Sequence, residues 1–151
     1  MMKVLVVQPE LCTGCRICEI ACSFSKTRSF NPAESRIKIV KIEEEGIDFP
    51  LTCLHCEDAP CVENCPVGAM WRDGNAVVLD RDLCLGCKVC LMVCPFGAIT
   101  LKNGKPIKCD LCGGDPFCVK VCPTGAIIFE DETRVRRKKA REYIKKVVEV
   151  V

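Results

Sequence analysis

Sixteen cysteines among 151 residues constrain this chain more than any other feature of its sequence. They form four sets of four and leave no cysteine over. The sets are Cys12, Cys15, Cys18 and Cys22; Cys53, Cys56, Cys61 and Cys65; Cys84, Cys87, Cys90 and Cys94; and Cys109, Cys112, Cys118 and Cys122. The third set has the spacing C-x2-C-x2-C-x3-C-P, in which three thiolates bind one iron–sulfur cluster and the fourth reaches another. We therefore predict four [4Fe–4S] clusters, with all sixteen cysteines as ligands.

Disulfides and zinc are two other uses of closely spaced cysteines, and both fit this sequence less well. Disulfide scaffolds belong to secreted chains, and the apolar run of residues 1–7 is too short for a secretory signal. Zinc takes two cysteine pairs per ion and has no use for the third cysteine or the proline after the fourth. The sequence has no twin-arginine start and no apolar stretch near the ~20 residues of a membrane helix. We expect a cytoplasmic protein without a membrane segment.

Few large side chains are available to build a core. The chain has six Phe, one Trp and one Tyr, and its cysteines inflate the hydrophobic fraction of 49%. Small domains with so little core depend on bound metal, so we expect the metal-free chain not to fold. Four clusters of about −2 each change the formal charge of +2 to about −6. The scarcity of Asn and Gln beside many Lys, Arg and Glu agrees with a thermophilic source.

Three of the four sets end in the same short repeat, C-P-x-G-A followed by Ile or Met. Its copies begin at Cys65, Cys94 and Cys122. The proline fixes the turn that carries the cysteine, and the Gly-Ala pair lets the backbone pass close to the sulfurs. The first set departs from this pattern because no proline follows Cys22. We expect Cys22 to lie on a different turn.

Short strands and single helical turns are expected between the cysteines, which gives an α+β fold. The expected strands are 4–7, 36–42, 70–71, 76–79, 99–101, 106–108 and 127–129. Asp73-Gly74 and Asn103-Gly104 are strong hairpin signals. Segments such as Cys90–Cys94 have the length of one helical turn. Residues 23–52 contain no cysteine and form either a partner-facing loop or a surface hairpin.

The end of the chain from Asp131 onward predicts an amphipathic helix. Its apolar residues at helical spacing are Ala140, Tyr143, Ile144, Val147, Val148 and Val151. The basic residues between them are compatible with nucleic acid or a membrane surface, but a solvated helix face is their usual meaning. We therefore expect no nucleic-acid partner. The apolar stripe is expected to pack on this protein or on a partner subunit.

The spacing leaves open how the sets share their fourth cysteines. Tandem pairing joins the first set to the second and the third to the fourth. Nested pairing joins the second to the third, inside the first and the fourth. Residues 66–83 hold one tidy hairpin, as in a two-cluster unit, whereas residues 23–52 resemble a transition between units. Nesting is favoured on this ground, but the spacing does not decide it.

Residues 3–130 resemble the four-cluster ferredoxin subunits of multi-subunit redox enzymes. The resemblance rests on the four sets, on Cys53-x2-Cys56-x3-Pro60-Cys61-x3-Cys65-Pro66 and on Lys108-Cys109-Asp-Leu-Cys112. That family serves molybdenum and tungsten pterin enzymes (dimethyl sulfoxide reductase, formate dehydrogenase, aldehyde oxidoreductases), some hydrogenases and carbon monoxide dehydrogenase. It implies an outer two-cluster unit of residues 1–52 and 109–130, an inner unit of residues 53–108 and a C-terminal helix of residues 131–151.

The resemblance also implies nested ligation. The implied ligand groups are Cys12, Cys15, Cys18 and Cys122; Cys109, Cys112, Cys118 and Cys22; Cys53, Cys56, Cys61 and Cys94; and Cys84, Cys87, Cys90 and Cys65. No cysteine is replaced by Trp, as happens in some relatives, so a three-iron cluster is not expected.

The remaining sequence predicts electron transfer rather than substrate chemistry. It has no phosphate-binding or dinucleotide-binding motif, and no cysteine is left to act as a nucleophile. His55 is expected to be a spacer, with a hydrogen bond to sulfur or a ligand role as alternatives. Arg16 and Lys88 place positive charge near their clusters, which tends to raise cluster potentials; exposed charges of little effect are the alternative.

The predicted role is an electron-transfer subunit with no catalytic site of its own. The small size favours a heterodimeric tungsten or molybdenum pterin aldehyde oxidoreductase of an anaerobe as the catalytic partner, with a soluble ferredoxin as the electron carrier. The alternatives are a free-standing polyferredoxin, or a subunit of a hydrogenase, formate dehydrogenase or carbon monoxide dehydrogenase.

Overall fold

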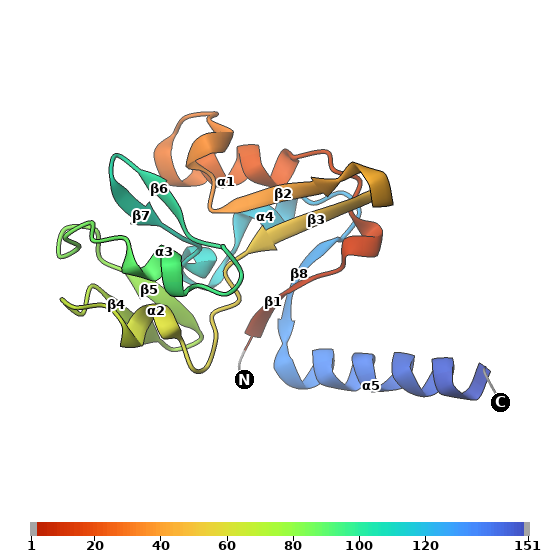
Figure 1. Ribbon diagram of the computed structural model, residues 1–151. Helices are drawn as coiled ribbons and strands as arrows, with labels where there is room; N and C mark the ends of the chain where they lie inside the picture. Colours follow the sequence, from red (N-terminus) through yellow and green to blue (C-terminus); the bar gives the residue numbers. More distant parts are fainter. Residues whose placement is uncertain (1–2, 150–151) are drawn as a thin grey trace.

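The computed structural model describes residues 3–149 (Figure 1). Two short hairpins lie at the positions that the sequence predicts. Strand β4 (Met70–Asp73) pairs with β5 (Ala76–Leu79), and β6 (Thr100–Lys102) pairs with β7 (Lys105–Ile107). Asn103 and Gly104 both have positive φ, as a type I′ turn requires. Both hairpin predictions are therefore confirmed.

The first and last strands of the chain lie side by side (Figure 1). Strand β1 (Lys3–Val7) pairs antiparallel with β8 (Ile127–Asp131), in a register that sets Val7 opposite Ile127. This pairing brings the N-terminal cysteines to the segment that carries the last ones.

The long segment without cysteines contains a hairpin. Strand β2 (Ile37–Ile42) pairs with β3 (Ile47–Thr52) across the 3-10 turn η3 (Glu43–Glu45). Ile37 and Ile39 are buried while the intervening lysine is not, which is the alternation of a half-buried strand. Of the two readings of residues 23–52, the hairpin is the observed structure.

The helices are mostly single turns. They are α2 (Pro60–Glu63), α3 (Val89–Val93) and α4 (Phe117–Val121), with the 3-10 turns η1 (Pro9–Leu11), η2 (Pro32–Glu34) and η4 (Leu111–Gly114). Helix α1 (Ile17–Thr27) is longer and contains Cys22. The expected turn at Cys22 is therefore wrong, because without a proline the helix continues until Arg28 adopts a left-handed conformation.

The buried hydrophobic side chains are largely aliphatic and include several cysteines. One cluster contains Cys18, Cys22 and Cys118 with three isoleucines, and another contains Met70, Cys90 and Ile99. Short helices and small antiparallel sheets around such clusters make up the predicted α+β class. Thiol groups thus occupy positions that aliphatic side chains fill in an ordinary core.

Helix α5 (Glu132–Glu149) runs away from the rest of the molecule (Figure 1). Its apolar residues Tyr143 and Val148 are 70% and 68% exposed, so the stripe does not pack on the described part of this chain. Residues 1–2 and 150–151, which the predicted domain boundaries and apolar stripe include, lie outside the described residues. No helix within residues 3–149 is long and apolar enough to cross a membrane.

Candidate iron–sulfur centres

Cysteines from opposite ends of the chain line one cavity. We call them the Cys12 group: Cys12, Cys15, Cys18 and Cys122. The β1–β8 pairing holds the two segments together, and Gln8 strengthens the junction. Its backbone N–H donates to the Ala126 carbonyl at 2.8 Å and its side chain donates to the Gly125 carbonyl at 3.0 Å. Ile39 and Pro50 of the β2–β3 hairpin complete the wall.

A second cavity has the same construction in the middle of the chain. Its cysteines are the Cys84 group: Cys84, Cys87, Cys90 and Cys65. In both cavities three cysteines of one set meet the proline-followed cysteine of another. Arg16 and Lys88 line the two cavities at equivalent positions, each with positive φ at the residue before a helix. Both residues therefore line the cavities of the cysteine sets that contain them.

Neighbouring thiols define two further groups. The Cys109 group is Cys109, Cys112, Cys118 and Cys22, and the Cys53 group is Cys53, Cys61 and Cys94, to which Cys56 is assigned by its place on the same loop. Burial raises the pKa of Cys118 far above its ordinary value, and Cys109, Cys22 and Cys112 raise it further. Burial likewise raises the pKa of Cys61, with Cys53 and Cys94 among its charged neighbours.

The Cys109 and Cys53 groups adjoin one another. Burial raises the pKa of Cys109 to about 11, and Cys53 of the neighbouring group contributes to this rise. Cys15 and Cys87 are exposed, and they belong to the Cys12 and Cys84 groups, whereas the Cys109 and Cys53 groups contain no exposed cysteine. Exposed cysteines are therefore confined to the Cys12 group and the Cys84 group.

A left-handed residue follows the first cysteine of every set by two positions. These residues are Gly14, His55, Gly86 and Leu111. In three sets this conformation aims the residue's own backbone N–H at the sulfur of that cysteine: the donors of residues 55, 86 and 111 lie 3.4 Å from Sγ. Hydrogen bonds of this kind favour the thiolate form that a metal needs.

The C-P-x-G-A turns direct further N–H groups at sulfur. Ala69 donates to Cys65 Sγ at 3.2 Å. Although burial raises the pKa of Cys65, the backbone N–H groups of residues 67–70 outweigh it, so the pKa lies below its ordinary value. The same balance lowers the pKa of Cys122 through residues 124, 126 and 127. The repeat thus acts as a thiolate-stabilising turn.

The donor chemistry of the cavities fits an iron–sulfur cluster. All sixteen cysteines are free thiols, and the N–H groups that approach their sulfurs complement negative charge. Thiolate ligands with amide hydrogen bonds to sulfur are the surroundings in which [4Fe–4S] clusters are held and tuned. Within residues 3–149 no three His, Cys, Asp or Glu side chains are arranged to hold a single metal ion.

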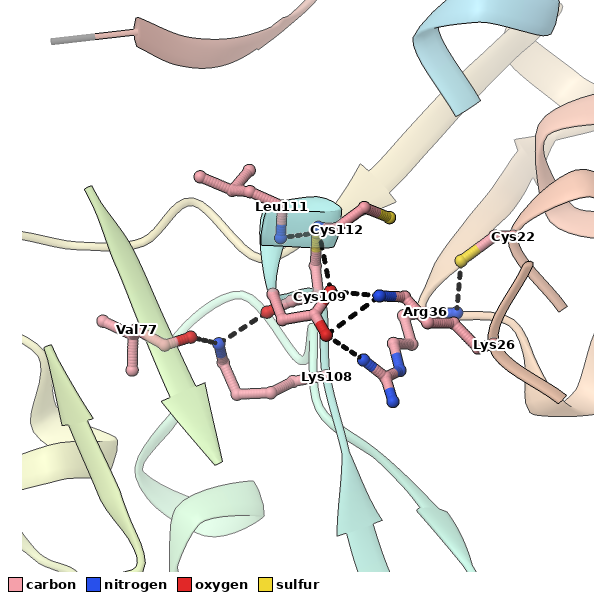
Figure 2. Close-up of polar contacts among 9 residues, drawn as sticks. Cys22, Lys26, Arg36, Val77, Lys108, Cys109, Leu111 and Cys112 are labelled. Carbon is pink, nitrogen blue, oxygen red and sulfur yellow. Dashed lines mark hydrogen bonds and ion pairs between the residues drawn. The ribbon is translucent and has the colours of Figure 1, made fainter. Parts of the chain in front are cut away.

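An ion-pair network joins α1 to the loop of the fourth set (Figure 2). Asp110 pairs with Lys26 at 2.7 Å and Arg36 at 2.6 Å, and also accepts from the Cys112 N–H at 3.0 Å. Burial raises the pKa of Asp110, but the two cations and the N–H reverse this and hold it below its usual range. The backbone N–H of Arg36 donates to Cys22 Sγ at 3.4 Å. Sequence reasoning missed this network, because only folding brings its members together.

Val77 of β5 links the second and fourth sets. Its N–H donates to His55 Nδ1 at 2.9 Å, and its carbonyl accepts from the Lys108 ammonium, which also donates to the Cys109 carbonyl at 2.7 Å. Burial lowers the pKa of His55 to about 4, and Lys108 adds to the effect. His55 is therefore more than a spacer, since its Nδ1 accepts a buried N–H. The sequence shows Lys108 only as part of a resemblance, with no sign of its burial.

Two family profiles, both described as 4Fe-4S dicluster domain, match the sequence over residues 45–132 and 11–69. The first spans more than half of the chain. The chain belongs to the 4Fe-4S dicluster family. For this 4Fe-4S dicluster protein, the expected ferredoxin-type α+β fold, [4Fe–4S] cofactors and electron-transfer character are confirmed.

Curated relatives of this dicluster protein carry names of redox components. Hydrogenase-4 component A of Escherichia coli is 39% identical, over 71% of this chain and 51% of the relative. The polyferredoxin-like subunit of an aliphatic sulfonate oxidoreductase of Pyrococcus furiosus is 38% identical, over 67% of this chain and 59% of the relative. The putative electron transport protein YsaA of Escherichia coli is 36% identical, over 72% and 75%. The dicluster protein spans about half the length of hydrogenase-4 component A.

Among solved structures, a chain of the active site complex BamBC of benzoyl coenzyme A reductase with benzoyl-CoA is similar to this dicluster protein. The TM-score is 0.50 and the identity 26%, over 95% of this chain and 90% of that chain. The similarity extends over nearly the whole of both chains.

Proposed function

We propose that the protein is the electron-transfer subunit of a larger redox enzyme and carries four [4Fe–4S] clusters, one for each cysteine group. The observation that carries the proposal is the convergence of cysteines from different sets on shared cavities, seen for the Cys12 and Cys84 groups. In the proposed assignment every cysteine is a ligand, and the pairing of the sets is nested. The outer unit is residues 1–52 and 109–130, the inner unit is residues 53–108, and residues 131–151 form the C-terminal helix.

The arrangement of the groups supports a linear path for electrons. Helix α1 carries Cys18 and Cys22 and so joins the Cys12 group to the Cys109 group, and α4 carries Cys118 and is followed by Cys122, which belong to the same two groups. Helices α2 and α3 join the Cys53 and Cys84 groups in the same way. With the Cys53–Cys109 junction in the middle, the proposed order is Cys84, Cys53, Cys109, Cys12 groups.

The two cysteine groups at the ends of this path are the ones that contain exposed cysteines. Cys15 and Cys87 are exposed, one in each end group. Leu85 and Met92, on the third set's loop and on α3, are 73% and 86% exposed. Apolar side chains this exposed at one end of the path are available for contact with a partner. We propose that a catalytic subunit covers one end and a soluble ferredoxin exchanges electrons at the other.

The proposed catalytic partner is a tungsten or molybdenum pterin aldehyde oxidoreductase, in a cytoplasmic heterodimer of an anaerobe. The names of the relatives support a redox complex in general, since they include components of a hydrogenase and of a sulfonate oxidoreductase. A hydrogenase component is therefore the second candidate. A free-standing polyferredoxin is the third.

Anaerobic purification from the native source tests this proposal. The chain should elute with a larger subunit that contains tungsten or molybdenum, and should hold about 16 iron atoms, four per cluster. Co-elution with a nickel subunit would favour the hydrogenase candidate, and elution alone would favour the polyferredoxin. An iron content well below 16 would contradict the assignment of four clusters.

A double cysteine variant separates nested from tandem pairing. Cys12→Ser with Cys122→Ser removes two ligands of one cluster if pairing is nested, and one ligand from each of two clusters if it is tandem. We expect about 12 iron atoms per chain, with the EPR signals of three clusters retained. About eight would indicate tandem pairing. The matched control is Cys12→Ser with Cys65→Ser, for which the two expected values exchange.

A further inference from the structure

Lys108 is a buried cation without a carboxylate partner in the described part of the chain. The residue is 3% exposed, and its ammonium donates to two neutral groups, the carbonyl oxygens of Val77 and Cys109 (Figure 2). The lysines with carboxylate partners, such as Lys102 with Glu34, are all more exposed.

A charge buried in this way needs a countercharge. Removing an ammonium from water costs several kcal/mol even after the protein relaxes. Carbonyl oxygens satisfy its hydrogen atoms but leave its net charge uncompensated. Asp110 lies two residues further on, but it already pairs with both Lys26 and Arg36. The balancing negative charge therefore has to come from another group.

Lys108 stands where two of the proposed clusters adjoin. It precedes Cys109 in the chain and bonds that residue's carbonyl, which places it beside the Cys109 group. It also reaches the loop of the Cys53 group, because Val77, whose carbonyl it bonds, donates its N–H at 2.9 Å to Nδ1 of His55, which lies between Cys53 and Cys56. Each cluster with four thiolates carries about −2 when oxidised and one more negative charge when reduced. Lys108 thus lies between two of the four clusters, each negatively charged, that the proposed function places in the molecule.

We propose that Lys108 is the shared countercharge of the Cys53 and Cys109 clusters and raises their reduction potentials relative to those of the two end clusters. The proposal rests on the assignment of four clusters above. A fixed positive charge stabilises the reduced cluster more than the oxidised one because the reduced cluster is more negative. Electrons that enter at either end are then drawn to the middle of the path.

Three variants of the full chain, purified with their clusters, separate charge from packing. Lys108→Met keeps most of the aliphatic stem and removes the charge, and Lys108→Arg keeps the charge. Lys102→Met removes the same charge from a half-buried lysine that pairs with Glu34 at 2.8 Å. The readouts are iron content and the four midpoint potentials, measured by anaerobic titration with dithionite and EPR detection.

In Lys108→Met we expect two of the four potentials to fall by at least the equivalent of a tenfold change in the reduction equilibrium, which is 59 mV for one electron. The other two potentials should not change, and none of the four potentials should change in Lys108→Arg or in Lys102→Met. Unchanged potentials in Lys108→Met, or an equal fall of all four, would overturn the proposal.

If Lys108→Met loses clusters, a further variant separates the loss of charge from the loss of a hydrogen-bond donor. Lys108→Gln provides an uncharged donor whose nitrogen is one bond closer to the backbone. If Lys108→Gln also loses clusters while Lys108→Arg keeps all four, the charge itself is required and the proposal is supported. If Lys108→Arg loses them as well, the site needs the shape of lysine and the proposal fails. Fewer than four clusters in the unaltered protein would refute the assignment of four clusters itself, and this outcome is distinct from an absent shift.

Discussion

Val77 donates its backbone N–H to Nδ1 of His55 at 2.9 Å. Because Nδ1 accepts this bond, the proton of the neutral imidazole is on Nε2. The carbonyl of the same residue accepts from Lys108. A single buried residue thus connects the loop of the second set to that of the fourth, and the bond to His55 is open to direct test.

Replacement of His55 should weaken the holoprotein in a graded way. His55→Ala leaves the buried N–H of Val77 without an acceptor, which costs about 1–3 kcal/mol. It also places alanine at φ 51°, a left-handed conformation that disfavours it. His55→Asn offers an oxygen in the position of Nδ1 and tolerates this backbone. The rate of cluster release in guanidinium chloride, followed by visible absorbance without oxygen, should be highest for alanine. Equal rates for the two variants would show that the bond to Val77 contributes little.

Loss of the Asp110 carboxylate should destabilise the junction between α1 and the fourth set. Asp110→Ala removes two ion pairs that are about one-third exposed, so we expect a cost of about 1–2 kcal/mol after allowance for solvent screening. Asp115→Ala is the matched control, because its pair with Lys120 is far more exposed and should contribute less than about 1 kcal/mol. Guanidinium midpoints of the two holoproteins give the comparison, and similar midpoints would argue against a structural role for the network.

Gly86 should tolerate alanine less well than Gly97 does. Both residues have positive φ, so each substitution costs about 1–2 kcal/mol of backbone strain. At Gly86 an added Cβ also meets the Gly104 carbonyl oxygen at 3.1 Å, whereas at Gly97 it meets nothing within 4 Å. Gly86→Ala should therefore release iron faster than Gly97→Ala under the same anaerobic conditions. Indistinguishable rates would mean that the β6–β7 turn moves aside freely.

Removal of the metal should unfold the chain. The buried clusters of side chains consist partly of cysteines, and without iron the metal bonds through which these cysteines would join distant segments are absent. After anaerobic chelation of iron, we expect far-UV circular dichroism and amide hydrogen exchange typical of an unfolded chain. Iron with sulfide should restore the fold and zinc should not. Slow exchange in the β2–β3 hairpin of the stripped protein would contradict this expectation.

Local features of the fold were predictable because they depend on neighbouring residues. Asn103-Gly104 specifies its own turn, and the C-P-x-G-A repeat specifies the conformation of its cysteine. The β1–β8 pairing was not predictable in this way, since its strands are short, apolar and at opposite ends of the chain. The extended α1 follows from the missing proline after Cys22, which predicts a departure from the repeat but does not by itself specify a helix.

The candidate site likewise has features that local sequence predicts and features that depend on distant contacts. The identity of its cysteines follows from spacing alone, whereas the N–H that Gly86 directs at Cys84 Sγ was not predicted. The placement of Lys108 depends on Val77, which lies 31 residues earlier in the chain, and no local pattern encodes this contact. The apolar stripe of α5 was recognised, but its exposure depends on how the helix leaves the body.

The pairing of the first strand with the last has a consequence for biosynthesis. Residues 3–7 leave the ribosome long before residues 127–131, so β1 has no partner until translation is nearly complete. The central part of the chain meets no such delay, because its hairpins join strands that are close in sequence. Maturation is therefore expected to proceed from the centre outward, and a nascent chain that stalls before residue 127 leaves its N-terminal thiols open to the cell's iron–sulfur assembly machinery and to oxidants alike.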